Sequence, residues 1–317
     1  MGTPAFAAVS LKSLLDAGHQ VCTVVTRPDA AAGRGLALHS SAVKSLAVER
    51  AIPLLQPASV RTPEFLAQIE SYAPEILVVV AFGKVLPERI LHAAPLGAVN
   101  VHASLLPKYR GAAPIPWAIA RGETQTGVTT MRMIDRLDAG DILLQRATPI
   151  GPVETAADLE RRLAILGADL LLETLEGLRQ GSIRPIRQDE AAATLAPTLK
   201  KEDARIDWSR PAEEIERHIR AFDPRPGAYT LLAGPDRKTL RIWKARVDPA
   251  GAPGARAGTL LACMPGPDAI GRGLRVACGD GSCLLVTELQ PEGRRRMTAV
   301  QAVSGRHVKE GDRLGGD

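Results

Sequence analysis

Residues 75–81 read Glu-Ile-Leu-Val-Val-Val-Ala, the clearest strand signal in the 317-residue chain. A continuous, largely β-branched run of this length is typical of a strand buried on both faces of a parallel sheet. Further apolar runs at 21–25, 97–102 and 127–133 repeat this signal, and stretches with helical periodicity separate them. Strands that alternate with helices predict an α/β domain of the Rossmann-like type, in which helices cover a parallel sheet.

Helices are predicted where a capping residue precedes apolar residues at helical spacing. Ser41 and Thr62 are suitable N-caps for two such helices in the first domain. A longer helix is predicted to start at Thr155, because its leucines recur every three or four residues, at Leu159, Leu163, Leu166, Leu170 and Leu171.

The first residues of the chain match the second part of an α/β unit, the loop and helix, and no strand precedes them. Gly2-Thr3-Pro4 matches the loop that normally follows a first strand, and residues 6–17 match the helix after that loop. We therefore expect that a central strand is missing before the loop and that translation starts at an upstream codon. Without such a strand, backbone groups of its neighbours would have no partner.

The second half of the chain has a different pattern. Polar, proline-containing sequence over 184–204 predicts a linker between a first domain, 1–183, and a second domain, 205–317. A helix over 212–221 opens the second domain, and short strands interrupted by Gly and Pro follow it. Short strands at regular spacing predict a small OB-like β-barrel, with Asp280-Gly281 as a hairpin turn between the last two strands.

The charge of the chain is unevenly distributed. Residues 1–204 contain 21 basic and 21 acidic side chains, whereas residues 205–317 contain 19 and 14 and so carry the whole net charge of +5. A basic surplus confined to one domain favours a polyanionic partner for that domain.

Composition excludes several classes of protein. No apolar run is long enough to cross a bilayer, and the first residues lack the features of a signal peptide, so we expect no membrane association and a cytoplasmic protein. The four cysteines are too few and too scattered for a disulfide framework, and no zinc motif is visible, so no metal is expected.

Two polar residues stand out in the strand at 97–102. Asn100 and His102 project from the same face, because side chains alternate along a strand. They lie toward the carboxyl end of that strand, where open α/β sheets bind ligands. An amide donor beside an imidazole predicts acyl transfer without a covalent intermediate, with Asn100 stabilising an oxyanion and His102 sharing that role or moving a proton.

A carboxylate is needed to orient the imidazole. Asp138 follows the next predicted strand, 127–133, in a glycine-containing loop, so it is expected at the same end of the sheet as His102. Asp141 is the competing residue in the same loop.

These residues belong to motifs that extend over most of the chain. Residues 100–114 read Asn-Val-His-Ala-Ser-Leu-Leu-Pro-Lys-Tyr-Arg-Gly-Ala-Ala-Pro, and 137–141 read Leu-Asp-Ala-Gly-Asp. Together they resemble the signature of the folate-dependent formyltransferases. Further matches cover essentially the rest of the chain, at residues 2–4, 32–35, 204–209 and 219–224.

The resemblance implies a reaction and a set of site residues. The formyl group of 10-formyltetrahydrofolate would be transferred to the amino group of methionyl initiator tRNA, for translation initiation. Asn100, His102 and Asp138 would form the catalytic trio, and the second domain would help to hold the tRNA. The folate would contact Ser104, Leu105, Leu106 and Pro107.

Basic residues in two segments are candidates for contacts with tRNA. Arg34 lies between two glycines in the loop 27–35, which the resemblance identifies with a tRNA-contacting insertion. The triplet Arg294-Arg295-Arg296 in the second domain is a candidate for phosphate contact. We expect the protein to act as a monomer.

Three other functions can be compared with this pattern. A formyltransferase that acts on an amino sugar or a nucleotide precursor would carry the same trio, although the basic second domain disfavours it. A non-catalytic RNA-binding protein with a degenerate folate cleft is disfavoured by the intact trio. A nicotinamide-dependent oxidoreductase is weaker still, since no Gly-x-Gly-x-x-Gly follows an early strand.

Overall fold

The computed structural model describes residues 1–32, 37–234, 237–264 and 273–315. Arg34 lies outside these residues. The chain forms two compact units, which are not two consecutive stretches of sequence. Unit 1 contains Met1–Pro114, Gln125–Pro149 and Leu159–Pro197, and unit 2 contains Ile115–Thr124, Ile150–Asp158 and Thr198–Asp317. Two segments from the predicted first domain therefore pack in unit 2, and the boundary at 184–204 remains a prediction.

The main sheet of unit 1 is mixed. Its strand order is β5, β6, β7 and β8, with bounds Leu77–Val79, Ala98–His102, Gln125–Arg132 and Ile142–Pro149. β5 and β6 are parallel, whereas β7 runs antiparallel to both β6 and β8. A wholly parallel sheet was predicted, and β7 and β8 correct that prediction. The nine residues 133–141 between β7 and β8 are too few for the crossover that parallel strands require.

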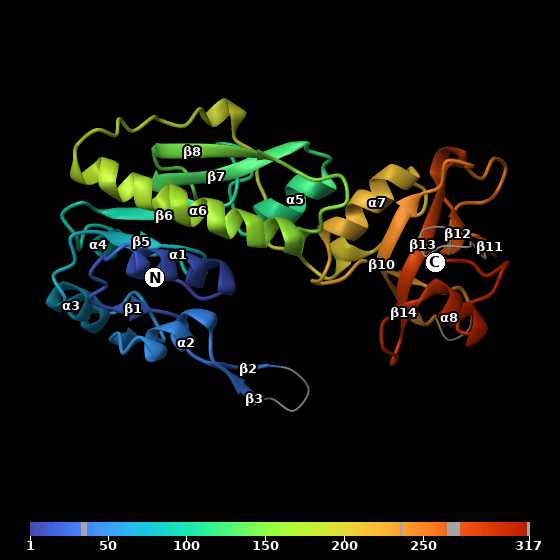
Figure 1. Ribbon diagram of the computed structural model, residues 1–317, viewed down its shortest axis with the longest axis horizontal. Helices are drawn as coiled ribbons and strands as arrows, with labels where there is room; N and C mark the ends of the chain where they lie inside the picture. Colours follow the sequence, from blue (N-terminus) through green and yellow to red (C-terminus); the bar gives the residue numbers. More distant parts are fainter. Residues whose placement is uncertain (33–36, 235–236, 265–272, 316–317) are drawn as a thin grey trace. The chain divides into compact units, whose positions relative to one another are not determined.

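Helices cover this sheet and carry the apolar positions that the sequence indicated. Ser41 caps α2 (Ala42–Glu49), and Thr62 caps α3 (Pro63–Ser71), each by accepting a backbone N–H three residues on. The long helix α6 (Ala156–Arg179) lies along the sheet (Figure 1). Gly167 allows its close approach, since a Cβ there would lie 2.9 Å from Val101 of β6. α4 (Glu88–Leu91) is a short helix of unit 1, whereas α5 (Pro114–Ala120) lies almost wholly in the Ile115–Thr124 segment of unit 2.

The beginning of the chain lies between a two-stranded sheet and the main sheet of unit 1. β1 (Val24–Val25) pairs in parallel with β4 (Leu54–Leu55), and Gly2 donates its N–H to Val25. On its other side, Gly2 bridges to Val80, directly after β5. Thr3 and Pro4 then lead into α1 (Ala5–Asp16), close to the predicted helix at 6–17. Met1 and Gly2 thus occupy the position between β1 and β5 where the sequence predicted a strand.

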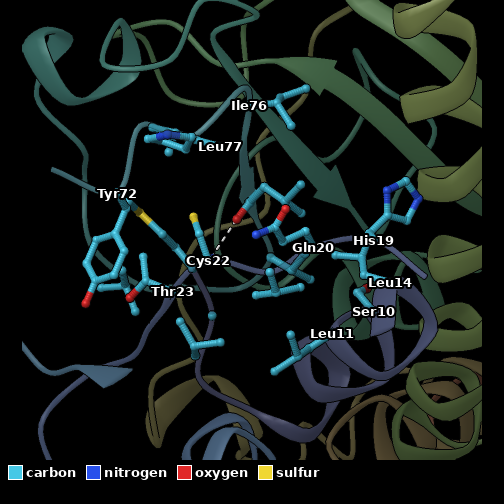
Figure 2. Close-up of a pocket in the computed structure, with 18 of the residues that line it drawn as sticks. Ser10, Leu11, Leu14, His19, Gln20, Cys22, Thr23, Tyr72, Ile76 and Leu77 are labelled. Carbon is cyan, nitrogen blue, oxygen red and sulfur yellow. Dashed lines mark hydrogen bonds between the residues drawn. The ribbon is translucent and has the colours of Figure 1, made fainter. Parts of the chain in front are cut away.

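A cavity of about 410 Å³ extends from Met1 along these strands. Figure 2 shows Cys22 and Thr23 at one side, Ile76 and Leu77 at another, and Leu11 and Leu14 of α1 nearby. The lining is mainly apolar side chains and strand backbone, and the Asn100–His102 face of β6 does not contribute to it. The cavity is therefore separate from the predicted chemistry.

Residues 30–32, which belong to the predicted loop 27–35, form a strand that makes a small hairpin with residues 37–39, and residues 33–36 lie outside the described residues. β2 (Ala30–Ala32) pairs antiparallel with β3 (Ala37–His39). Asp29, just before β2, is held by a 3.0 Å hydrogen bond from Gln56 and an ion pair with Lys44. The base of the hairpin is therefore attached to unit 1.

Unit 2 is built on an antiparallel sheet. Its order is β11, β12, β13, β10 and β9, and β14 pairs with β13. Ile215 and Ile219 of α7 (Ala212–Ala221) are buried, as is Ile242 of β10. The turn before β13 has Asp280 and Gly281 at positive φ, as the hairpin signal predicted. The other bounds are β9 Tyr229–Leu231, β10 Thr239–Val247, β11 Leu260–Met264, β12 Gly273–Ala277, β13 Cys283–Pro291, β14 Met297–Thr298 and α8 Ala299–Ser304.

The fold class is confirmed. An α/β unit of Rossmann-like type is followed by a smaller, mostly antiparallel β unit. Both carry their own buried apolar side chains, for example Leu163 and Leu171 in unit 1 and Phe222 and Leu289 in unit 2.

Candidate active site

Strand β6 places Asn100 and His102 on one face of the main sheet. Val101 projects to the opposite face, where it packs against α6. Asn100 is 9% exposed and His102 is 6% exposed, so both are almost fully enclosed. In the described part of the chain, the Asn100 amide makes no hydrogen bond. Asn100 can therefore donate a hydrogen bond to a ligand on this face.

His102 lies between two hydrogen-bond acceptors. Its Nε2 is 2.9 Å from the carbonyl oxygen of Tyr109, and its Nδ1 is 3.7 Å from Oδ2 of Asp138. A neutral imidazole carries one N–H, and the Tyr109 carbonyl places that hydrogen on Nε2. A proton gained at Nδ1 would then face the Asp138 carboxylate. This arrangement can accept and hold a proton at Nδ1.

Asp138 reaches His102 by a route that the sequence did not predict. Asp138 was expected near His102 because two successive parallel strands end at the same side of a sheet. That reason is wrong, because β7 is antiparallel to β6. The loop after β7 begins beside Ala98, at the other end of β6, and folds back across the face. Asp138 adopts a positive φ of 47°, and its Oδ2 accepts the Gly111 N–H at 2.8 Å.

The competing residue Asp141 lies elsewhere. Asp141 directly precedes β8, and its carbonyl accepts the N–H of Arg132 at the end of β7. Within the described residues its carboxylate forms no ion pair with His102. Of the two candidate carboxylates, Asp138 and Asp141, the structure brings Asp138 to the imidazole.

The loop after β6 divides into buried and accessible side chains. Ser104 is fully buried, and its hydroxyl donates to the Lys108 carbonyl at 2.7 Å. Leu106 is buried in a cluster with Met131 and Ile142. Leu105 and Pro107 are half-buried. Of the four residues predicted to contact folate, only Leu105 and Pro107 therefore have side chains available to a ligand.

A buried polar network lies beside the Asp138 loop. Arg110 is almost fully buried and donates from Nε to Gln188 and from both Nη atoms to Glu190. These contacts hold the pKa of the Glu190 carboxyl below its ordinary value. The sequence analysis did not identify Gln188 or Glu190, because both lie in a segment with the composition of a linker. No local signal in that segment distinguishes them.

The arginine triplet lies in unit 2, in the turn between β13 and β14. Arg296 is 2.5 Å from Glu288 and stacks on the ring of Trp243 at 5.3 Å. Arg294 and Arg295 are exposed, and among the described residues neither side chain forms an ion pair. The three arginines are thus not equivalent, since a carboxylate offsets the charge of the third.

Two negative findings apply to the described residues. No group of three or more His, Cys, Asp or Glu side chains there could hold a metal ion. No helix among them is both long enough and apolar enough to cross a membrane.

Solved structures share this fold. HypX from Aquifex aeolicus in complex with tetrahydrofolic acid matches with a TM-score of 0.58 and 21% identity, over 81% of this chain and 43% of that chain. An N-formyltransferase from Helicobacter canadensis in complex with folinic acid and dTDP-3-aminofucose matches with a TM-score of 0.65 and 18% identity, over 90% and 96%. At these identities the likeness concerns the fold alone.

Sequence relatives are much closer. Methionyl-tRNA formyltransferase from Anaeromyxobacter dehalogenans is 50% identical over 96% of this chain and 95% of its own length. The enzyme of that name from Pelobacter propionicus is 49% identical over 100% and 95%. The patterns of the formyl transferase family and of its C-terminal domain match residues 1–175 and 198–307. The chain therefore belongs to the formyl transferase family.

Proposed function

We propose that the protein transfers the formyl group of 10-formyltetrahydrofolate to the amino group of methionyl initiator tRNA. The relatives that carry this activity in their names are about 50% identical to the chain over nearly its whole length. The observation that carries the chemical part of the proposal is the contact of His102 with Asp138 on the face of β6 that also carries the Asn100 amide.

Formyl transfer requires stabilisation of negative charge and movement of protons. A bond forms between the methionyl nitrogen and the formyl carbon, while the bond from that carbon to the donor nitrogen breaks. Asn100 donates a hydrogen bond to the carbonyl oxygen as it gains negative charge. His102 takes the proton that the amine loses and returns it to the departing nitrogen. Each proton released is therefore taken up again.

Asp138 has a separate role in this scheme. With Nε2 of His102 fixed by the Tyr109 carbonyl, the carboxylate faces the nitrogen that gains the proton. The negative charge stabilises the imidazolium and keeps the ring in one orientation. The Gly111 N–H holds the carboxylate in place.

The face of β6 fits a folate donor. When bound, 10-formyltetrahydrofolate supplies the activated formyl carbon. The half-buried side chains of Leu105 and Pro107 offer apolar contact in the loop that follows β6, the strand of Asn100 and His102. Backbone groups of the 104–107 loop are held by Thr129 and Gln145, which keeps this contact surface in one shape.

The acceptor in this proposal is tRNA rather than an amino sugar. The Helicobacter canadensis enzyme binds a nucleotide sugar, but its 18% identity supports only a common fold. The basic surplus of residues 205–317 agrees with a polyanionic acceptor. We also infer that the protein works as a monomer and, because translation initiation takes place there, in the cytoplasm.

Formyl transfer to methionyl initiator tRNA tests this proposal directly. Asn100→Ala, His102→Ala and Asp138→Ala should each lower kcat by roughly 100- to 10,000-fold while folate binding changes little. His92→Ala is the matched control, because that imidazole is exposed. Near-normal turnover in all three variants would contradict the assignment of the trio. Absence of transfer by the wild-type protein, with tRNA still bound, would favour the non-catalytic alternative.

A further inference from the structure

Gln188 is a buried amide that hydrogen-bonds to the Asp138 loop and to Arg110, and its Nε2 also lies 4.0 Å from Sδ of Met131. It is 5% exposed, and its Nε2 donates to the carbonyl oxygens of Asp138 and Gly140 at 2.8 and 2.7 Å. Its Oε1 accepts from Nε of Arg110 at 3.0 Å. These partners determine the orientation of the amide, since a flipped side chain would face two carbonyl oxygens with its own oxygen.

Arg110 connects Gln188 to the other side of the Asp138 carboxylate. The Arg110 backbone exchanges hydrogen bonds with the 194–196 segment, to the Thr194 carbonyl and from the Ala196 N–H at 2.8 and 2.7 Å. The next residue, Gly111, donates to Oδ2 of Asp138. The segment 188–196 therefore holds both the loop that carries Asp138 and the backbone N–H that orients its carboxylate.

The Asp138 loop needs such support. Its backbone has a positive φ at Asp138, which costs free energy in a residue other than glycine. The loop also crosses the face of the sheet instead of continuing a strand, so the β-ladder does not position it. The hydrogen bonds from Gln188 go to the two carbonyls on either side of Ala139. These hydrogen bonds fix the loop backbone at Asp138 itself, where a small shift of the backbone would move the Asp138 carboxylate away from His102.

We propose that Gln188 and Arg110 are positioning residues for formyl transfer, which keep Asp138 at the distance from His102 that proton transfer requires. This inference rests on the proposed role of Asp138. Within the described residues, neither side chain hydrogen-bonds to Asn100 or His102. Glu190 completes the network at its solvent end, where it pairs with Arg110 and Arg136.

The substitution Gln188→Glu tests this role with almost no change in shape. A carboxylate still accepts from Arg110 but repels the carbonyls of Asp138 and Gly140. We expect kcat to fall on the order of 100-fold, because a misplaced catalytic group has that effect, while folate affinity changes less than about threefold. Protonation of the introduced carboxyl group restores one donor, so the deficit should narrow only as the pH is lowered toward the ordinary Glu pKa of about 4.3.

Two further variants separate positioning from folding. Gln188→Met removes the hydrogen bonds without adding a charge, so its kcat should fall with no recovery at low pH. Gln68→Glu adds the same charge on the exposed surface of α3 and should behave as the wild type. Circular dichroism and folate binding, measured on each sample, show whether the protein is folded.

Two results would overturn the inference. One is a folded Gln188→Glu protein with wild-type kcat. The other is an equal loss of turnover and folate affinity at every pH, which a merely structural residue would produce. Failure of the wild-type protein to formylate methionyl initiator tRNA would instead refute the proposed function.

Discussion

At the scale of single residues, the positions of hydrogen-bond acceptors determine what an imidazole can do. His102 has an acceptor at each ring nitrogen, the Tyr109 carbonyl and the Asp138 carboxylate. His218 in α7 has a different environment. Its Nε2 has no hydrogen-bond partner within the described residues, and its ring lies 4.5 Å from that of Phe222. Burial lowers the pKa of His218 below its ordinary value of 6.5.

This difference predicts a pH dependence of stability. As the pH falls through 6.5, the unfolded chain binds a proton at His218 that the native ring resists, so the free energy of unfolding decreases. The substitution His218→Asn should flatten this part of the profile, although it also removes the ring contact and lowers stability at neutral pH. Urea unfolding of both proteins at a series of pH values measures the effect. Parallel profiles would show that His218 does not contribute.

At the scale of elements, the segment 110–113 pairs with 194–196 at a distance that only glycine allows. Gly111 has a φ of 123°, and a Cβ on it would lie 2.6 Å from the carbonyl oxygen of Ala196. Gly181, after α6, also has a positive φ of 66°, but a Cβ there would meet nothing within 4 Å. Both glycines therefore adopt a positive φ, but only Gly111 also lies in close contact with another segment.

Alanine at these two positions should therefore have unequal effects. Gly181→Ala should cost about 1 kcal/mol for the positive φ, whereas Gly111→Ala should cost several kcal/mol because the 194–196 segment must move. Gly111→Ala should also lower kcat, since Gly111 donates to Asp138. Urea unfolding and formyl transfer provide the two measurements. Equal destabilisation by the two substitutions would rule out the close contact as the cause.

At the scale of the whole molecule, the charge is concentrated in residues 205–317, where basic side chains outnumber acidic ones by 19 to 14. Arg294 and Arg295 contribute exposed charge without an ion pair among the described residues, whereas Arg296 is paired with Glu288. Phosphate contacts release counterions, so they make the affinity for a nucleic acid depend on salt.

The double substitution Arg294→Ala/Arg295→Ala should weaken tRNA binding across all sequences. It should also reduce the slope of log Kd against log salt by about one for each phosphate that the protein no longer neutralises. Arg296→Ala should have a smaller effect, because the charge of Arg296 is already offset. Filter binding at several salt concentrations checks both. An unchanged slope in the double variant would place the tRNA contacts elsewhere.

Local chemistry in the sequence determined much of this molecule. The caps Ser41 and Thr62, the bounds of α7 and the turn at Asp280-Gly281 depend on residues close in the chain, and all were predictable. The shared face of Asn100 and His102 also follows from strand alternation alone. Edge strand β8 was not predicted, since its outer half alternates between exposed and half-buried residues.

Tertiary structure decided the features that depend on the path of the chain. Strand direction is one of them, because β7 is buried on both faces and so carries the continuous apolar pattern of a parallel strand although it is antiparallel. The antiparallel direction of β7 changed the route by which Asp138 reaches His102. Gln188 is another, because it lies 50 residues from Asp138 in a segment of ordinary polar composition. Its partners exist only once the chain has folded, so the sequence alone determined which residues could do the chemistry, and the fold determined which of them meet.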